Sequence, residues 1–200
     1  MILAVLILAG GMSQRMGQDK ALLEIEGVSM LRRTWDIAQT LTSAVWVVTS
    51  RGDRYRPLLP PRAQWISEPL PGGGTTPAGP LVAFAQALEQ VEADWILLLP
   101  CDLPALQADV LHQWYQALPE IGSDAIAYLP RQTKGWEPLC GFYRRTCLPC
   151  LQTYVAAGGR SFQQWLAQQT VQAIPNVPTE MLMNCNTPED WANYRSKKLG

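Results

Sequence analysis

The amino-acid sequence predicts an α/β fold of three layers, in which a mostly parallel central sheet lies between helices. Short runs of continuous apolar residues recur along the chain, and amphipathic segments separate them. Continuous hydrophobicity is typical of strands that are buried on both faces of a parallel sheet. Strands that alternate with helices indicate βαβ units, whose crossovers are almost always right-handed.

Four apolar runs are the candidate strands. They cover residues 2–9, 45–48, 95–99 and 125–129, and each ends at a glycine, a proline or a polar residue. Between them, apolar residues spaced by three and four predict one helix in each of the segments 31–41, 81–88 and 110–118.

The chain changes in character after residue 129. Two short helical patterns at 148–155 and 162–166 precede a strand-like segment at 170–174 and a helix from Pro188. We expect this half to complete the sheet and to form one wall of the functional site.

Composition limits the classes of function. A chain of 200 residues that is 48% hydrophobic can bury a full core, so residues 1–200 are expected to form one domain. With 16 Lys and Arg against 17 Asp and Glu, the formal charge of −1 provides no overall field for nucleic acid or a membrane surface. An odd number of cysteines, five, favours a reducing compartment, and we expect the protein to be cytoplasmic.

The first apolar run, "MILAVLILA", raises the alternative of a signal peptide. It lacks a basic beginning, and a Gly-rich, basic stretch follows it where a cleavage site would be expected. A buried strand that leads into a binding loop is the preferred interpretation.

The stretch "GGMSQRMGQDK" follows this strand directly. In open α/β sheets the carboxyl ends of the strands are where ligands bind. Gly10, Gly11 and Gly17 allow the backbone to approach phosphate oxygens, and Arg15 and Lys20 add positive charge. The stretch matches neither a Walker A loop nor a G-x-G-x-x-G fingerprint, and a plain turn would also account for its glycines.

Asp102 lies just beyond the apolar run in "WILLLPCDLP". A carboxylate facing a phosphate loop repels the phosphates unless a divalent cation lies between them, and Mg²⁺ prefers one or two carboxylates together with phosphate oxygens and water. The alternative is that Asp102 caps the helix that starts near Gln107.

Two further segments carry candidate residues for a second substrate. In "NCNTPEDW", Thr187 reads as a helix N-cap, while Asn184 and Asn186 project on one side of an extended segment. Near Trp136 and Trp165, a ring and an arginine, one of Arg144, Arg145 and Arg160, would suit a flat, phosphorylated molecule, although core packing is the simpler role of both tryptophans.

Taken together, "LAGGMSQRMGQDKALLEIEG", "GPL", "PCDLP", "EPLCGFY" and "NCNTPED" resemble the molybdenum cofactor guanylyltransferases of the MobA type, over Leu8 to Asp190. The resemblance implies a Rossmann-like nucleotidyltransferase fold. It also implies transfer of GMP from MgGTP to the terminal phosphate of molybdenum-molybdopterin, with release of pyrophosphate.

The resemblance assigns GTP binding to Leu8, Ala9, Gly10, Gly11 and Lys20, Mg²⁺, the implied cofactor, to Asp102, and a nucleotide contact to Glu68. We add Gly79 and Asp102 to the expected nucleotide-binding residues, and we expect Arg15, Lys20 and Asp102 to be catalytic because the reaction needs alignment and charge stabilisation. That Asn184, Asn186, Arg144 and Arg160 contact the second substrate is a hypothesis.

The resemblance also divides the chain into a nucleotide-binding part, about 1–130, and a second-substrate part, about 131–200. GTP and molybdopterin would be the substrates, and molybdenum-insertion proteins and molybdoenzyme chaperones the partners. The sequence departs from the family pattern at Glu68, where aspartate is usual, in a longer loop up to Gly79, and at 160–161, where an Arg pair is frequent.

Three alternatives stay open at this point. One is a cytidylyltransferase that acts on the same pterin, and another is a transferase of sugar phosphates. Both commonly read LAAG where this chain has Gly10 and Gly11. The third is a nucleotide-binding or carrier module without catalysis, which has no need of Asp102 and Lys20.

Overall fold

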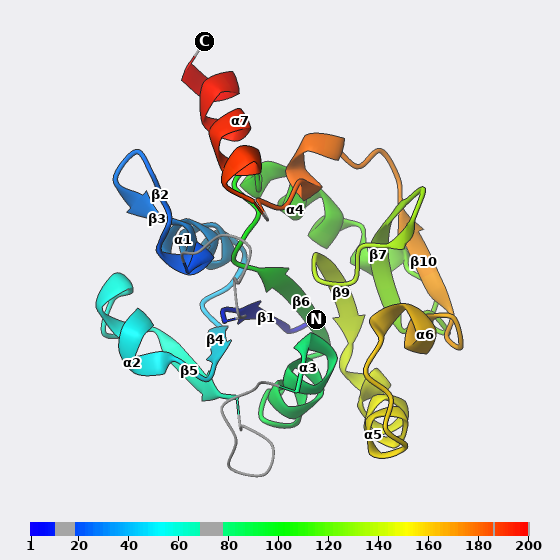
Figure 1. Cartoon of the computed structure of the whole chain (residues 1–200). Coiled ribbons are helices and arrows are strands. Elements are labelled where there is room, and N and C mark those ends of the chain that lie inside the picture. Colours follow the sequence, from blue (N-terminus) through cyan, green and yellow to red (C-terminus); the bar gives the residue numbers. More distant parts are fainter. Residues whose placement is uncertain (11–18, 69–77, 186, 200) are drawn as a thin grey trace.

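A computed structural model describes residues 1–10, 19–68, 78–185 and 187–199. Within these residues an eight-stranded sheet runs through the middle of the molecule (Figure 1). Its strands are β1 (Leu3–Leu8), β4 (Val45–Thr49), β5 (Gln64–Ser67), β6 (Trp95–Pro100), β7 (Ala127–Gln132), β8 (Gly135–Trp136), β9 (Gly141–Arg144) and β10 (Val171–Ile174). A separate hairpin joins β2 (Glu24–Ile25) to β3 (Val28–Ser29).

The strand order is β10-β7-β9-β6-β1-β4-β5, and β8 pairs with β7. Along this order only β9 is antiparallel to its neighbours, because it pairs with both β6 and β7 in the opposite direction. The prediction of a mostly parallel sheet is therefore confirmed.

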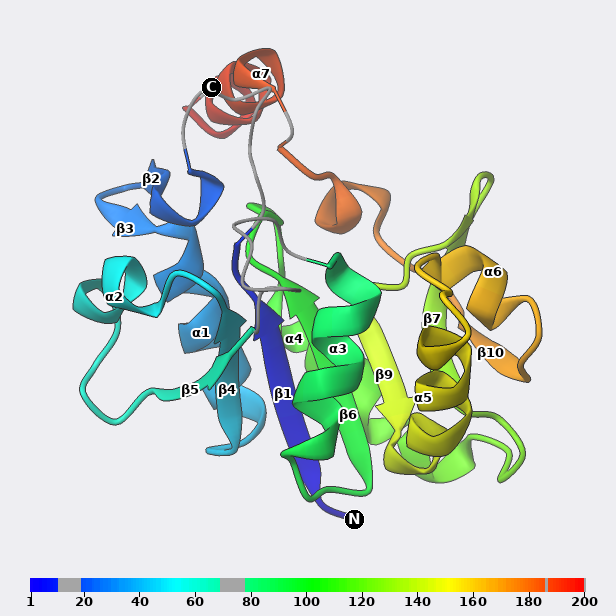
Figure 2. The ribbon, with the colours of Figure 1, turned by 60° about the horizontal axis from the view of Figure 1, so that its bottom comes forward.

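Helices cover both faces of the sheet. They are α1 (Met30–Leu41), α2 (Gly52–Tyr55), α3 (Pro80–Glu89), α4 (Ala108–Gln116), α5 (Leu148–Ala156), α6 (Phe162–Leu166) and α7 (Pro188–Leu199). Figure 2 shows α3, α5 and α6 in front of the sheet and α1 and α4 behind it, while α7 lies beyond the carboxyl ends of the parallel strands.

The continuous hydrophobicity of the strands is explained by two separate cores. Val5 and Ile7 of β1 point to the side of α1 and α4, whereas Ala4 and Leu6 point to the side of α3, α5 and α6. All four side chains are buried, so a polar residue at any of these positions would lie in one core or the other.

Among the described strands, five escaped the sequence-based prediction, namely β2, β3, β5, β8 and β9. Strand β5 lies at an edge of the sheet, and only Ile66 of its four residues is buried. Strand β9 begins at Gly141, where an added Cβ would lie 2.6 Å from Cδ2 of Leu129 and 2.9 Å from the carbonyl oxygen of Tyr128. No helix in the described ranges is long and apolar enough to cross a membrane.

Candidate active site

The end of β1 passes close to the end of β4. The amide of Ala9 donates to the carbonyl of Val48 (3.0 Å), and Gly10 follows with φ of 134°. A Cβ at Gly10 would lie 3.3 Å from Oγ1 of Thr49, so both the backbone conformation and the space favour glycine here. The predicted contacts at Gly11 and Arg15, and the turn at Gly17, lie outside the described residues.

Lys20 and Asp102 meet at the carboxyl edge of the sheet. Nζ of Lys20 lies 2.9 Å from Oδ2 of Asp102, and the two side chains are 17% and 18% exposed. Lys20 begins the 3-10 helix η1 (Lys20–Leu22), and Asp102 lies in the turn after β6. The alternative of Asp102 as a helix cap does not hold, since Gln107 occupies the N-cap of α4 and Asp102 contacts Lys20 instead.

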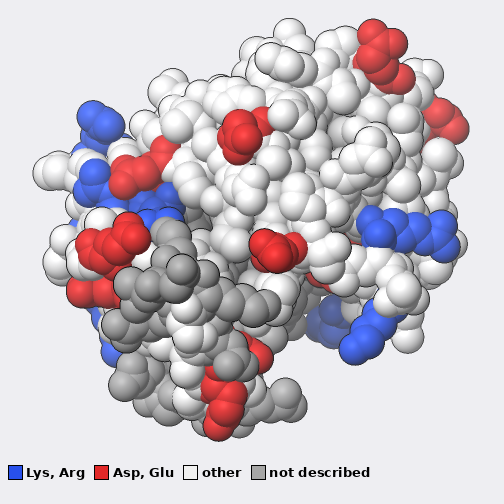
Figure 3. All heavy atoms as spheres, turned by 90° about the horizontal axis from the view of Figure 1, so that it is seen from above, with Lys and Arg blue, Asp and Glu red and all other residues white. Residues whose placement is uncertain are grey.

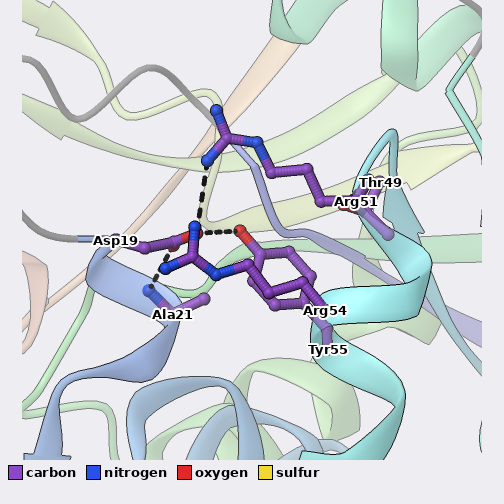
Figure 4. A network of polar contacts seen from close by, with 6 residues as sticks. All are labelled: Asp19, Ala21, Thr49, Arg51, Arg54 and Tyr55. Carbon is purple, nitrogen blue, oxygen red and sulfur yellow. Dashed lines mark hydrogen bonds and ion pairs between the residues drawn. The ribbon is translucent and has the colours of Figure 1, made fainter.

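The carboxylate of Asp19 is the centre of a polar network (Figure 4). Its Oδ2 accepts hydrogen bonds from the hydroxyl of Tyr55 (2.8 Å) and from Nη1 of Arg51 (3.2 Å), and Nη1 of Arg54 lies 3.4 Å away. Burial raises the pKa of Tyr55, and the hydrogen bond to the Asp19 carboxylate raises it further. The network thus connects Asp19, which precedes η1, to α2 and to Arg51, which precedes α2.

The same carboxylate sets the start of η1. Asp19 is the N-cap of this helix, and its Oδ1 accepts from the amide of Ala21 (3.2 Å). Because Lys20 lies between the cap and Ala21, the network fixes the backbone that carries the Lys20 side chain. Sequence analysis missed this role of Asp19. The sequence feature that could have indicated it is an Asp directly before the candidate lysine, together with two arginines shortly after β4.

The donors at the site suit a hard cation better than a soft one. Asp102 offers carboxylate oxygens, whereas the neighbouring Cys101 is buried, and burial raises the pKa of its thiol to about 12. Among the described residues, no three His, Cys, Asp or Glu side chains cluster as a metal site. Mg²⁺ bound by one carboxylate together with substrate phosphates fits this donor set, and a closed thiolate site does not.

Glu68 and Gly79 flank the segment 69–77, which is outside the described residues. The amide of Glu68 donates to the carbonyl of Thr49 (3.1 Å), so Glu68 lies beside the strand ends that carry Gly10. Its side chain is buried, and burial raises the pKa of its carboxyl. Gly79 has φ of 100° and precedes Pro80 at the start of α3.

The segment with Asn184 reaches the same edge. The amide of Cys185 donates to the carbonyl of Asp102 (3.3 Å). The exposed Asn184 directly precedes Cys185, so it lies close to the site. Asn186 lies outside the described residues. Thr187 caps α7 through a mutual pair of hydrogen bonds with Asp190 (2.9 and 3.1 Å), as predicted.

The structure does not bring Arg144 to this edge. Arg144 pairs with Trp95, the first residue of β6, and therefore lies at the opposite edge from Asp102. Its guanidinium stacks on the Trp95 ring (4.3 Å to the centroid) and donates to backbone carbonyls, among them that of Ala125 (2.9 Å). Arg160, in the turn between α5 and α6, donates to carbonyls of its own segment.

The structure separates the two tryptophans. Trp165 is fully buried and stacks against Tyr143 (6.2 Å between centroids), so its role is packing. Trp136 is half-buried, and the arginine over its ring is Arg131 (5.1 Å), which sequence analysis did not single out.

Charges on the face seen in Figure 3 are scattered among uncharged residues, with acidic and basic side chains interspersed. The described basic side chains on this face do not form the continuous stripe that a nucleic-acid duplex needs.

Comparisons with known proteins place this geometry in a family. The model of the MobA-like NTP transferase domain matches residues 5–189. The chain belongs to this family. It is accordingly a nucleotidyltransferase, and the resemblance seen in the sequence is confirmed.

Relatives of this MobA-like chain cover nearly its whole length. A protein of Trichormus variabilis named "Probable molybdenum cofactor guanylyltransferase" is 50% identical over 95% of this chain and 89% of its own length. A protein of Synechococcus elongatus with the same name is 48% identical over 94% of this chain and 95% of its own. The crystal structure of molybdopterin-guanine dinucleotide biosynthesis protein A from Archaeoglobus fulgidus has the same fold, with a TM-score of 0.77 and 19% identity over 98% of both chains.

Proposed function

We propose that this chain transfers GMP from MgGTP to the terminal phosphate of molybdenum-molybdopterin, which gives the guanine dinucleotide cofactor and pyrophosphate. The names of relatives that match over almost the whole chain support the reaction. The single observation that supports catalysis is the pair of Lys20 and Asp102 at the carboxyl edge of the sheet, because a binding module has no need of opposed charges there.

In this reaction a terminal phosphate oxygen of molybdopterin attacks the α-phosphorus of GTP. The bond between the α-phosphorus and the oxygen that bridges to the β-phosphate breaks, and pyrophosphate leaves. The protein's task is to align the two phosphates and to stabilise the negative charge that develops. We assign charge stabilisation to Lys20 and Arg15, and nucleotide contacts to the backbone of Leu8, Ala9, Gly10 and Gly11 and to Glu68 and Gly79.

Asp102 would hold Mg²⁺. When bound, Mg²⁺ supplies positive charge to the phosphates of the nucleotide. The carboxylate of Asp102 is only 18% exposed and points to Lys20, so the same position would place a metal next to the phosphate-binding lysine.

The two substrates would approach from the two parts of the chain, GTP on residues 1–130 and molybdopterin on residues 131–200. Asn184, Asn186 and Arg160 remain proposed contacts of molybdopterin, whereas Arg144, which pairs with the first residue of β6 at the opposite edge of the sheet, is not assigned to this role. The setting would be the cytoplasm, and molybdenum-insertion proteins and molybdoenzyme chaperones would be the partners.

Calorimetry tests the nucleotide first. GTP, ATP, CTP and UTP are titrated with Mg²⁺ into the wild type, Asp102→Ala and the control Asp36→Ala, whose carboxylate forms an exposed ion pair with Arg32 in α1. We expect preference for GTP, weakened in Asp102→Ala and unchanged in Asp36→Ala. Transfer from labelled GTP to molybdopterin then tests the reaction. Preference for CTP would assign the chain to a cytidylyltransferase and contradict the proposal.

A further inference from the structure

An arginine and a tryptophan stack at the carboxyl edge of the sheet, on the part of the chain that carries no assigned nucleotide contact. Arg131 lies opposite Trp136 in the β7–β8 ladder, with its guanidinium carbon 5.1 Å from the centre of the indole ring. We call these two residues the 131/136 shelf.

The sheet register places the shelf at the same edge of the sheet as the site, with β9 between the strands that carry them. Tyr128 of β7 pairs with Phe142 of β9, and Phe142 pairs with Leu97 of β6. Counting along the parallel strands β7 and β6, Arg131 therefore reaches the level of Pro100, just before Asp102. Strand β8 leads into β9, which lies between β7 and β6, so Trp136 is on the side of β7 that faces β6. Figure 2 shows the hairpin after β7 rising at the same edge of the sheet as α7.

The backbone of the shelf is held in place. Gln163 of α6 accepts from the amide of Trp136 (3.2 Å) and donates to its carbonyl (2.6 Å). Gly135 has φ of 123°, and a Cβ there would lie 2.8 Å from Oε1 of Gln163. The hydroxyl of the buried Tyr143 donates to the carbonyl of Pro138 (2.6 Å), which fixes the segment that follows.

Arg131 differs from the other stacked arginine of this half of the chain. The guanidinium of Arg144 donates hydrogen bonds to the carbonyls of Ile121, Gly122 and Ala125. Arg131 is exposed, and no carboxylate among the described residues forms an ion pair with it. An exposed planar cation on an indole ring suits a planar ring that carries acceptor atoms and a phosphate.

We propose that the 131/136 shelf binds the ring of the second substrate, a phosphorylated pterin, by stacking and by hydrogen bonds from the Arg131 guanidinium. The inference rests on the proposed function for the identity of this ring. It adds two residues to the second-substrate side and explains why Gln163 fixes the backbone of a half-exposed tryptophan.

Steady-state kinetics with molybdopterin and GTP test the shelf in Arg131→Ala, Arg131→Lys and Trp136→Phe. Arg56→Ala is the matched control, because Arg56 stacks on Trp65 (5.3 Å) away from the site, and Trp65 pairs with Val47 in the middle of β4. Losing a stacked, hydrogen-bonding cation is expected to raise KM for molybdopterin in Arg131→Ala about tenfold, with KM for GTP changed less than about twofold. Arg131→Lys keeps the charge but not the planar stack and is expected to recover only part of the loss.

A binding measurement separates the shelf from the reaction. The fluorescence of 6-hydroxymethylpterin phosphate is titrated with wild type, Arg131→Ala, Trp136→Phe and Arg56→Ala. We expect the wild type and the control to bind the probe tightly, as measured by quenching of its fluorescence, and both shelf variants to bind it more weakly. If the wild type transfers GMP while the shelf variants keep wild-type KM and probe affinity, the shelf inference is overturned and the proposed function stands. If the wild type does not transfer GMP to molybdopterin, the proposed function fails whatever the probe shows.

Discussion

Replacing Asp19 by Asn tests whether the Asp19 network positions Lys20. The variant keeps one oxygen, which can still cap η1, but an amide NH2 replaces the oxygen that accepts from Tyr55 and faces Arg51 and Arg54, and the charge is lost. If the network holds the η1 backbone, its loss should weaken nucleotide binding through the displaced Lys20 side chain, although Asp19 itself touches no assigned substrate group.

The contacts of Asp19 set the magnitude. The carboxylate is 6% exposed, and a buried hydrogen bond to a charged group such as the one from Tyr55 contributes roughly 1.5–3 kcal/mol. Arg51 and Arg54 are 36% and 54% exposed, so solvent screening leaves each pair about 0–1 kcal/mol. We expect Asp19→Asn to lower the free energy of unfolding by about 1–2 kcal/mol, and Asp19→Ala by about 3 kcal/mol.

A double-mutant cycle is the assay. The affinity for MgGTP is measured by calorimetry in the wild type, Asp19→Asn, Lys20→Ala and the double variant, with Asp36→Asn as a surface control. We expect Asp19→Asn to weaken binding about tenfold in the wild-type background and hardly at all when Lys20 is absent. The same tenfold loss in the Lys20→Ala background would refute the reasoning, since Asp19 would then act independently of Lys20.

Three further outcomes are expected. Asp102→Asn should lower turnover roughly 10²–10³-fold with little loss of stability, because one preorganised charge is removed; near-normal turnover would contradict the assignment. Lys20→Ala should destabilise the protein by about 1–2 kcal/mol because it leaves the part-buried Asp102 carboxylate without this cation, and adding Asp102→Asn should recover part of that loss, as measured by urea unfolding. Glu68→Gln should leave Tm unchanged near pH 4 and raise it at pH 8. The raised pKa of the Glu68 carboxyl means that its protonated form, which Gln imitates, stabilises the fold below about 4.3, the unfolded pKa, and that this contribution is lost as pH rises through the folded pKa. A difference in Tm that does not depend on pH would contradict this linkage.

The buried strands could be predicted because burial on both faces of the sheet requires an apolar residue at almost every position. Strands β1, β4 and β6 are continuous apolar runs for this reason, and helix α1 shows the spacing of a single buried face. Strand β5 lies at an edge, and β9 needs a glycine at Gly141 for a close backbone contact, so neither shows this pattern. Their places in the sheet depend on pairing across distant segments, which local periodicity does not report.

The site was predictable where a residue follows a strand end and not where distant segments meet. Lys20 and Asp102 both follow predicted strands, and the structure joins them. Arg144 was selected for its closeness in sequence to Trp136, but β9 runs antiparallel and carries Arg144 to the opposite edge of the sheet. Arg131 lies over the indole ring because β8 pairs with β7, and only the register reveals this contact.

The pairing of Lys20 with Asp102 also bears on how the substrate is accepted. Nζ of Lys20 lies 2.9 Å from Oδ2 of Asp102, so each charge neutralises the other, and both side chains are mostly buried. MgGTP carries both counter-charges, the metal for Asp102 and the phosphates for Lys20, so the complete pair can replace the internal contact without leaving either group uncompensated. GTP without the metal would satisfy Lys20 and repel Asp102. If the proposed function holds, we expect the metal complex to bind more tightly than the free nucleotide, before any chemistry takes place.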